Sequence, residues 1–190
     1  MDNALILASS SPRRLELLAQ IGLTPDVRPS NVDESPVTGE TGIAMVQRLA
    51  RLKCEAVDAV TPVLAADTVV IRGTRVYGKP ESQAHAIDML LSLSGVEHTV
   101  ATAVCIKAEE QLHECVVKST VRFTTIDEAT ATRYWQTGEP EGKAGSYAIQ
   151  GMGAVFVERL SGSYSNVMGL PLFETAQLLS NIGLDCLQQP

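Results

Sequence analysis

The chain has few aromatic residues, no excess of positive charge and no long apolar run. Aromatic side chains make up 4% of its 190 residues and apolar residues as a whole make up 45%, so the core has to be largely aliphatic. That apolar share, with only 19% charged residues, excludes a disordered tail protein. The formal charge of −7 argues against a general binder of duplex DNA or RNA, which normally carries a basic excess. A small anionic ligand, held by a few placed cations and a metal ion, is compatible with this composition.

Signals for export and for disulfide formation are missing as well. The first residues contain no basic segment, and the apolar run at 4–8 is too short for a signal peptide or a membrane span. The four cysteines (Cys54, Cys105, Cys115 and Cys186) are scattered and form no CxxC pair, so we expect reduced thiols, although Cys105 and Cys115 could face each other across a hairpin. We therefore expect a soluble cytoplasmic protein that binds neither nucleic acid nor membranes.

Helical and strand-like patterns alternate along the chain, which favours an α/β architecture in one domain spanning 1–190. Strands are expected at 5–8, 63–72, 98–107 and 114–125, with a short return strand that ends at Tyr77. Helices are expected at 12–20, 42–59, 82–93 and 171–183, and a capping box of Thr125 and Glu128 predicts another that ends near Thr137. Because strands outnumber the helices that could connect them, we expect a mixed sheet and not a doubly wound one.

A serine-rich loop joins the first expected strand to the first expected helix. It carries Ser9 and Ser11, and Arg13 and Arg14 follow in the first helical turn. The helix dipole disfavours two arginines at this end, whereas free backbone N–H groups beside guanidinium groups suit a phosphate. The alternative is a pair of solvated arginines, with Ser11 serving only as the helix N-cap. The pattern alone leaves both interpretations open.

Lys53 and Asp67 are charged residues in apolar surroundings. Lys53 lies in the middle of the apolar stripe of the helix at 42–59, so it either extends outward from the edge of the stripe or points into a cleft toward an anion. Asp67 interrupts the apolar strand at 63–72, where an ionised carboxylate needs a cation, a metal ion or several hydrogen-bond donors. The alternative for Asp67 is a carboxylate at a strand end that caps a neighbouring loop. Its apolar flanks on both sides favour the functional interpretation.

Three further segments offer groups for an anionic ligand. Glu34, next to Asp33 in a loop, could share a divalent ion with Asp67, because hard cations take carboxylate oxygens. Lys79 lies in a rigid Gly-Lys-Pro loop from which an ammonium could reach phosphate. Gln150 stands in a glycine-rich segment that lets a ligand approach the backbone, although a turn amide could equally satisfy its own loop. The sequence contains no P-loop, HExxH or GxGxxG motif.

In their order and spacing, these segments resemble the Maf family of nucleoside triphosphate pyrophosphatases. The motifs that carry the resemblance span nearly the whole chain: LASSSPRR (7–14), DE (33–34), LARLK (49–53), ADTVV (66–70), GKP (78–80), LSG (93–95), KAG (143–145) and GLP (169–171). The resemblance implies an elongated mixed sheet with two lobes flanking a deep cleft, as in the inosine-triphosphate pyrophosphatase (Maf/HAM1) fold, and it implies a homodimer. Gly142 departs from the family pattern, since relatives often have an acid before Lys-Ala-Gly.

The same resemblance implies an activity and a role for each of the residues singled out above. The reaction is hydrolysis of a nucleoside triphosphate between its α- and β-phosphates, with Mg²⁺ or Mn²⁺ as the cofactor. Asp67 is the expected general base, and Glu34 together with Asp67 is expected to hold the metal ion. The expected ligands of the triphosphate are Ser9, Ser11, Arg13, Arg14, Lys53 and Lys79.

The resemblance also implies, through three positions, which nucleotide base the protein recognises. Family members that cleave dTTP and UTP match this chain at Arg13, Thr68 and Gln150. Uracil and thymine present an N3–H donor beside carbonyl acceptors, and a carboxamide matches both, whereas a carboxylate would suit guanine, as in the subgroup that acts on 7-methyl-GTP. Gln150 and Thr68 are therefore expected to read the base. Two other functions stay open, namely hydrolysis of 7-methyl-GTP or non-standard purine triphosphates, and a division regulator that binds nucleotide without hydrolysing it.

Overall fold

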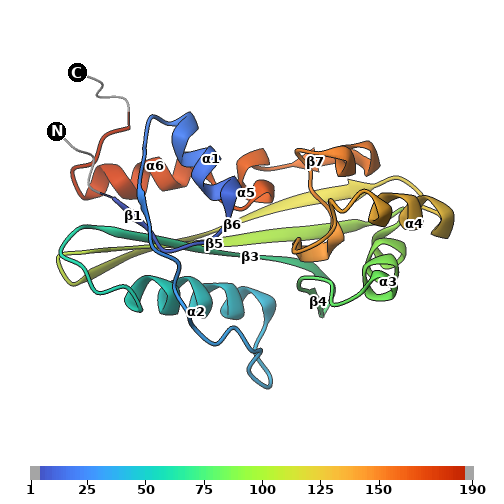
Figure 1. Ribbon diagram of the computed structural model, residues 1–190, viewed down its shortest axis with the longest axis horizontal. Helices are drawn as coiled ribbons and strands as arrows, with labels where there is room; N and C mark the ends of the chain where they lie inside the picture. Colours follow the sequence, from blue (N-terminus) through green and yellow to red (C-terminus); the bar gives the residue numbers. More distant parts are fainter. Residues whose placement is uncertain (1–4, 187–190) are drawn as a thin grey trace.

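A computed structural model describes residues 5–186, in which seven strands form one mixed sheet (Figure 1). The strands are β1 (Ile6–Leu7), β2 (Asp26–Val27), β3 (Val63–Arg72), β4 (Arg75–Tyr77), β5 (Glu97–Ala108), β6 (Gln111–Phe123) and β7 (Val157–Ser161). Their order is β2-β1-β3-β5-β6-β7, and β4 pairs with β3 outside this path. β1 runs parallel to β2 and β3, and the other pairs are antiparallel. The expected mixed α/β class is confirmed.

Helices cover both faces of the sheet. They are α1 (Pro12–Gln20), α2 (Gly42–Glu55), α3 (Gln83–Leu93), α4 (Glu128–Gln136), α5 (Tyr164–Met168) and α6 (Leu172–Asn181). α2 packs on β3 and β5, while α1, α5 and α6 lie on the opposite face at the same end of the sheet (Figure 1). α3 and α4 pack against each other at the other end, so the molecule is elongated along its long strands. None of the helices within residues 5–186 is long and apolar enough to cross a membrane.

The long strand β3 lies between two apolar cores. Ala66 packs into the larger core, and Ala65 packs into the smaller core beneath α2. Side chains alternate between the two faces of a strand, so Asp67 belongs to the α2 face and Thr68 to the opposite face. Two adjacent polar residues are thus presented to different sides of the sheet.

One edge of β3 is open in its middle. β1 pairs with β3 only at Val63 and Leu64, and β4 pairs with β3 only from Val70 onward. Within the described residues, 65–69 therefore have β5 on one edge and no strand on the other. Asp67 and Thr68 lie in this gap, which gives a ligand access to both faces of the strand around its edge.

Two expected helix boundaries were wrong. α2 ends at Glu55 and not at 59, because the chain turns there and Val57 packs into the core beneath the helix. The expected capping box at Thr125 does not form. α4 instead begins after Asp127, whose side chain accepts a hydrogen bond from the backbone N–H three residues on at 2.7 Å. An aspartate two residues closer to the helix provides the cap that was assigned to the threonine.

β5 and β6 form a hairpin with a tighter turn than expected. Glu109 and Glu110 both have positive φ, +48° and +62°, which suits a two-residue turn matched to the twist of the strands. β6 consequently begins at Gln111, three residues before the expected position. In this register Cys105 and Cys115 are one position out of alignment, and each pairs with a different residue. All four cysteines are free thiols.

His98 is a buried titratable residue in β5. It is 2% exposed, its ring packs edge-on against Phe123 and Tyr147, and its Nε2 lies 2.9 Å from the Tyr147 hydroxyl. Its Nδ1 has no hydrogen-bond partner among residues 5–186. Burial lowers the pKa of His98 from 6.5 to about 4, so the ring is neutral in the folded protein at neutral pH.

We expect His98 to make the protein sensitive to mild acid. The unfolded chain binds more protons than the folded one between pH 6.5 and about 4, so the free energy of unfolding falls as the pH drops through this window, by up to about 1.4 kcal/mol per pH unit. Urea unfolding of the wild type and of His98→Gln at pH 7, 6 and 5 measures the effect, with His113→Gln in β6 as the control. Equal pH dependence in the wild type and His98→Gln would contradict the prediction.

Candidate active site

A cleft of about 340 Å³ opens at the gap in the edge of β3. The sequence singled out ten residues for catalysis or binding, and the structure places all of them on the wall of this cleft: Ser9, Ser11, Arg13, Arg14, Glu34, Lys53, Asp67, Thr68, Lys79 and Gln150. They come from segments that are far apart in the chain and that meet around the middle of β3. Their shared location is an observation, whereas the roles assigned to them stay predictions.

The N-terminus of α1 faces the cleft without a cap. Ser11 occupies the N-cap position, but its side chain makes no capping hydrogen bond to a described residue, and the first turn contains no acid. The Ser11 N–H instead donates to Ser9 Oγ at 3.2 Å, which ties the loop together. The positive end of the helix dipole and its free N–H groups are therefore left for a ligand. This favours the anion-binding interpretation of the serine loop.

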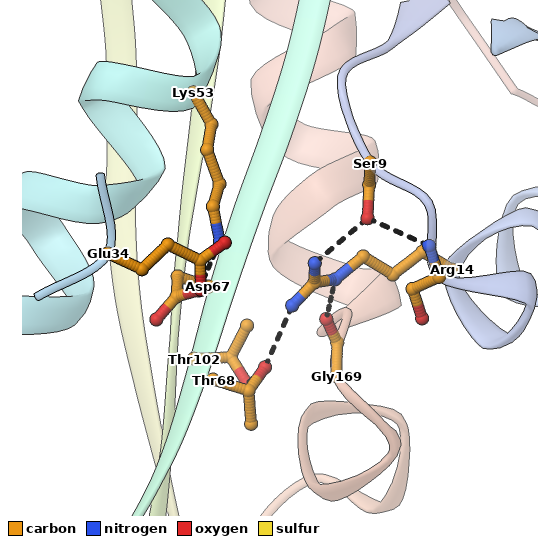
Figure 2. A network of polar contacts seen from close by, with 9 residues as sticks. Ser9, Arg14, Glu34, Lys53, Asp67, Thr68, Thr102 and Gly169 are labelled. Atoms are coloured by element: carbon orange, nitrogen blue, oxygen red, sulfur yellow. Dashed lines mark hydrogen bonds and ion pairs between the residues drawn. The ribbon is translucent and has the colours of Figure 1, made fainter. Parts of the chain in front are cut away.

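Arg14 is held by neutral acceptors (Figure 2). Its Nε donates to the Gly169 carbonyl at 2.9 Å, Nη1 to Ser9 Oγ at 3.0 Å and Nη2 to Thr68 Oγ1 at 3.2 Å. Burial lowers the pKa of Arg14, and the nearby charge of Asp67 partly offsets this effect. No described carboxylate forms an ion pair with Arg14, so a fixed guanidinium presents its charge, and those of its five N–H groups that are not used, to the cleft.

Lys53 points into the cleft and joins two carboxylates (Figure 2). It is 7% exposed, and its Nζ lies 2.7 Å from Asp67 Oδ1 and 2.9 Å from Glu34 Oε1. Burial alone would raise the pKa of Glu34, but the hydrogen bond and the charge of Lys53 hold it below its usual range. The snorkelling interpretation of Lys53 is therefore wrong, and Asp67 is an ion-paired carboxylate within the sheet and not a cap at a strand end.

Positive charge exceeds negative charge around the cleft. Five cationic side chains line it against two carboxylates, which are Glu34 and Asp67. Burial lowers the pKa of Arg13 and of Lys143, and the positive charge of Arg13 lowers the pKa of Lys143 further. An anionic ligand would relieve both effects, since it pairs with cations that have lost part of their hydration.

Gln150 is a further residue on the wall of the cleft. Its side chain is exposed and makes no hydrogen bond to any described residue. It therefore does not satisfy its own loop, as the alternative interpretation required. A free amide in this position offers one acceptor and two donor hydrogens to a ligand.

The sequence model of the family described as "Maf-like protein" matches residues 4–182. The chain belongs to the Maf family. A protein of Acinetobacter baylyi named dTTP/UTP pyrophosphatase is 49% identical to this Maf chain over 179 residues, which cover 93% of this chain and 98% of the relative. Proteins with the same name in Pseudoalteromonas atlantica and in Neisseria meningitidis serogroup B are 50% and 42% identical, and the matches cover 95% of this chain and 97% and 95% of the relatives.

A solved structure of the Staphylococcus aureus Ham1 protein is a more distant match to this Maf chain. It is 20% identical, covers 66% of this chain and 72% of its own, and has a TM-score of 0.45.

The two carboxylates of this Maf protein fit a divalent cation that is bound together with phosphate. Asp67 and Glu34 converge on one ammonium nitrogen, at 2.7 and 2.9 Å, so they are close enough to share a cation. Within residues 5–186 no group of three or more His, Cys, Asp or Glu side chains converges. Mg²⁺ is commonly bound by one or two carboxylates, with water and substrate phosphates completing its shell. The donor set thus suits an ion that the substrate helps to hold.

Several cleft residues were not found by sequence reasoning. Lys143 was noticed only as part of a motif and Tyr147 only as part of the glycine-rich segment, although both line the cleft. Thr102 was missed too; it is buried and does not line the cleft, but its Oγ1 lies 3.0 Å from Thr68 Oγ1 and donates to the Asn166 carbonyl at 2.9 Å. Thr102 could be identified only from its position opposite Thr68 in the β3–β5 pairing, and the sequence alone does not give this register.

Proposed function

We propose that this Maf protein is a nucleoside triphosphate pyrophosphatase that hydrolyses dTTP and UTP to the monophosphate and pyrophosphate. One observation carries the proposal. In a chain of net charge −7, five cationic side chains gather around one cleft, and both of its carboxylates contact one of them, Lys53. A triphosphate supplies the negative charge that such a cleft lacks. The names of relatives at 42–50% identity, dTTP/UTP pyrophosphatase, support the same reaction.

Asp67 is the general base of the proposed mechanism. It takes a proton from a water molecule whose oxygen attacks the α-phosphorus, and the bond between that phosphorus and the bridging oxygen breaks. The electron pair of the broken bond leaves with pyrophosphate. Lys53, 2.7 Å from Asp67 Oδ1, holds the carboxylate in place for this proton transfer.

The other cleft residues bind the triphosphate and neutralise its charge. Arg13, Arg14 and Lys79 balance the charge that develops on the leaving pyrophosphate. Ser9 and Ser11, with the N–H groups of α1, hold the phosphate oxygens. The fixed geometry of Arg14 supports this role, because a guanidinium that is already positioned loses little freedom when the substrate binds.

Gln150 and Thr68 read the base in this proposal. The single hydroxyl hydrogen of Thr102 is used on the Asn166 carbonyl, so in their mutual contact Thr68 is the donor and Thr102 the acceptor. Thr68 has therefore no proton left for a ligand and can only accept. The N3–H of uracil or thymine is a donor that such an acceptor suits, and the free amide of Gln150 suits the neighbouring carbonyl.

The remaining expectations are part of the same proposal. Glu34 and Asp67 would hold Mg²⁺ or Mn²⁺, which when bound neutralises phosphate charge. The free thiols and the family resemblance support a cytoplasmic, single-domain, two-lobed protein. Exposed apolar side chains such as Phe173 and Val155, with the resemblance, support a homodimer.

A nucleotide panel tests the proposed function. The purified protein is incubated with Mg²⁺ and each of dTTP, UTP, CTP, dATP, GTP, 7-methyl-GTP and ITP, and the products are separated by chromatography. We expect monophosphate and pyrophosphate from dTTP and UTP, with little from the purine nucleotides. Preference for a purine would keep the enzyme class and overturn the base-reading roles. Folded protein that hydrolyses none of them in the presence of metal would favour the non-catalytic regulator.

A further inference from the structure

The loop of residues 148–153, here called the Gln150 loop, carries an amide that its own contacts do not orient. The Gln150 side chain is exposed and has no hydrogen-bond partner within residues 5–186. A long side chain without packing or hydrogen bonds samples several rotamers. The place of the amide in the cleft consequently depends on the backbone of the loop.

Glu139 and Tyr134 hold this backbone on both sides of the amide. The two carboxylate oxygens of Glu139 accept hydrogen bonds from the N–H groups of Met152 and Gly153, both at 2.9 Å. The Tyr134 hydroxyl accepts from the Ala148 N–H at 3.1 Å and donates to Glu139 at 2.6 Å. One connected network therefore fixes the beginning and the end of the loop.

Two glycines make the close approach of this network possible. A Cβ at Gly151 would lie 2.1 Å from Glu139 Oε2, and a Cβ at Gly153 would lie 2.6 Å from Tyr134 Oη. The space that the Glu139 carboxylate occupies therefore requires glycine at position 151.

We propose that Glu139, supported by Tyr134, is a specificity-positioning residue that places Gln150 for recognition of the base. It does not contact the substrate, and it acts through the backbone of the Gln150 loop. This inference rests on the proposed function, because it requires that Gln150 recognises the base.

A carboxylate suits this position better than the amide of the same shape. Three donors, one hydroxyl and two N–H groups, converge on two oxygens of Glu139. Burial alone would raise the pKa of Glu139, but the bonds from Tyr134, Gly153 and Met152 hold it below its usual range. At neutral pH the group is thus an acceptor only. Glutamine would turn its NH₂ toward one of the donors and lose that bond.

The first experiment compares Glu139→Gln with Glu141→Gln. Glu141 is an exposed carboxylate two residues further along the connection that follows α4. For Glu139→Gln we expect kcat/KM with UTP to fall about tenfold, mainly through KM, while the inhibition constant of inorganic tripolyphosphate, which has no base, stays within about twofold. Glu141→Gln should change neither. An equal loss for UTP and tripolyphosphate would overturn the proposal.

A double-mutant cycle shows whether Glu139 acts through Gln150. In a Gln150→Ala background, Glu139→Gln should no longer weaken UTP hydrolysis, because there is no amide left to position. Additive losses would overturn the proposal. If Glu139→Gln does not fold, Tyr134→Phe replaces it in the cycle, since it removes only the hydroxyl that joins Ala148 to Glu139.

Binding of α,β-methylene-UTP separates this inference from the proposed function. The analogue keeps the base and cannot be cleaved at the bond in question, so calorimetry measures base recognition without turnover. Weaker binding by Glu139→Gln than by the wild type, with tripolyphosphate binding unchanged, supports the inference even if the wild type hydrolyses nothing. Equal binding of the analogue by both proteins, or none by the wild type, would overturn it.

Discussion

Asp67→Asn is expected to lower kcat for UTP by about 10²-fold or more while the fold stays intact. Asparagine has nearly the same shape as aspartate but cannot take a proton from water. Its side-chain oxygen still accepts the hydrogen bond that Lys53 Nζ gives to Asp67 Oδ1 at 2.7 Å, so the packing between α2 and β3 is preserved. Pyrophosphate release measures the rate, and thermal unfolding checks the fold.

Asp58→Asn is the matched control for this variant. It makes the same chemical change at an exposed position that does not line the cleft. Its kcat should stay within about twofold of the wild type, as for most surface substitutions. If Asp67→Asn turned over UTP at the wild-type rate, Asp67 would not be the general base.

Gln150→Glu should depress hydrolysis of dTTP and UTP more than it affects binding of the triphosphate. A carboxylate has no N–H, so it cannot donate to a base carbonyl, and it places an acceptor opposite an acceptor. We expect kcat/KM for UTP to fall by about tenfold or more relative to the purine triphosphates. Rates over the nucleotide panel measure this ratio, and competition by inorganic tripolyphosphate reports on phosphate binding alone.

Gln111→Glu adds the same charge in the β5–β6 hairpin, outside the cleft. It controls for a general effect of more negative charge on the approach of an anionic substrate. If the ratio of kcat/KM for UTP to that for the purine triphosphates were the same in Gln150→Glu and Gln111→Glu, Gln150 would not recognise the base.

The parts of the site that could be predicted are those where the local sequence is chemically out of place. Asp67 stands in an apolar strand and Lys53 in an apolar stripe, and each needs a partner wherever the fold puts it. The sequence could not say that they are partners of each other. That pairing depends on α2 packing across β3, which is a relation between segments and not a property of either one.

Other positioning residues gave no local signal. Thr102 is an ordinary threonine in a strand until the antiparallel register sets it opposite Thr68. Glu139 reads as a solvated carboxylate in a turn until the fold brings it to the N–H groups of the Gln150 loop. The end of α2 was misplaced for a similar reason, because Val57 continues the helical pattern in sequence while its burial is satisfied outside the helix.

The gap in the edge of β3 also bears on how such a site can change during evolution. Residues 67 and 68 are adjacent in the chain but belong to opposite faces of the sheet, one toward Lys53 and the other toward Arg14 and Thr102. A substitution at the second position alters the neighbourhood of α1 and β5 and leaves the ion pairs beneath α2 in place. Positions 67 and 68 can therefore change independently. A descendant protein can gain a new substrate through a substitution at position 68 and keep the same reaction through the residue at position 67.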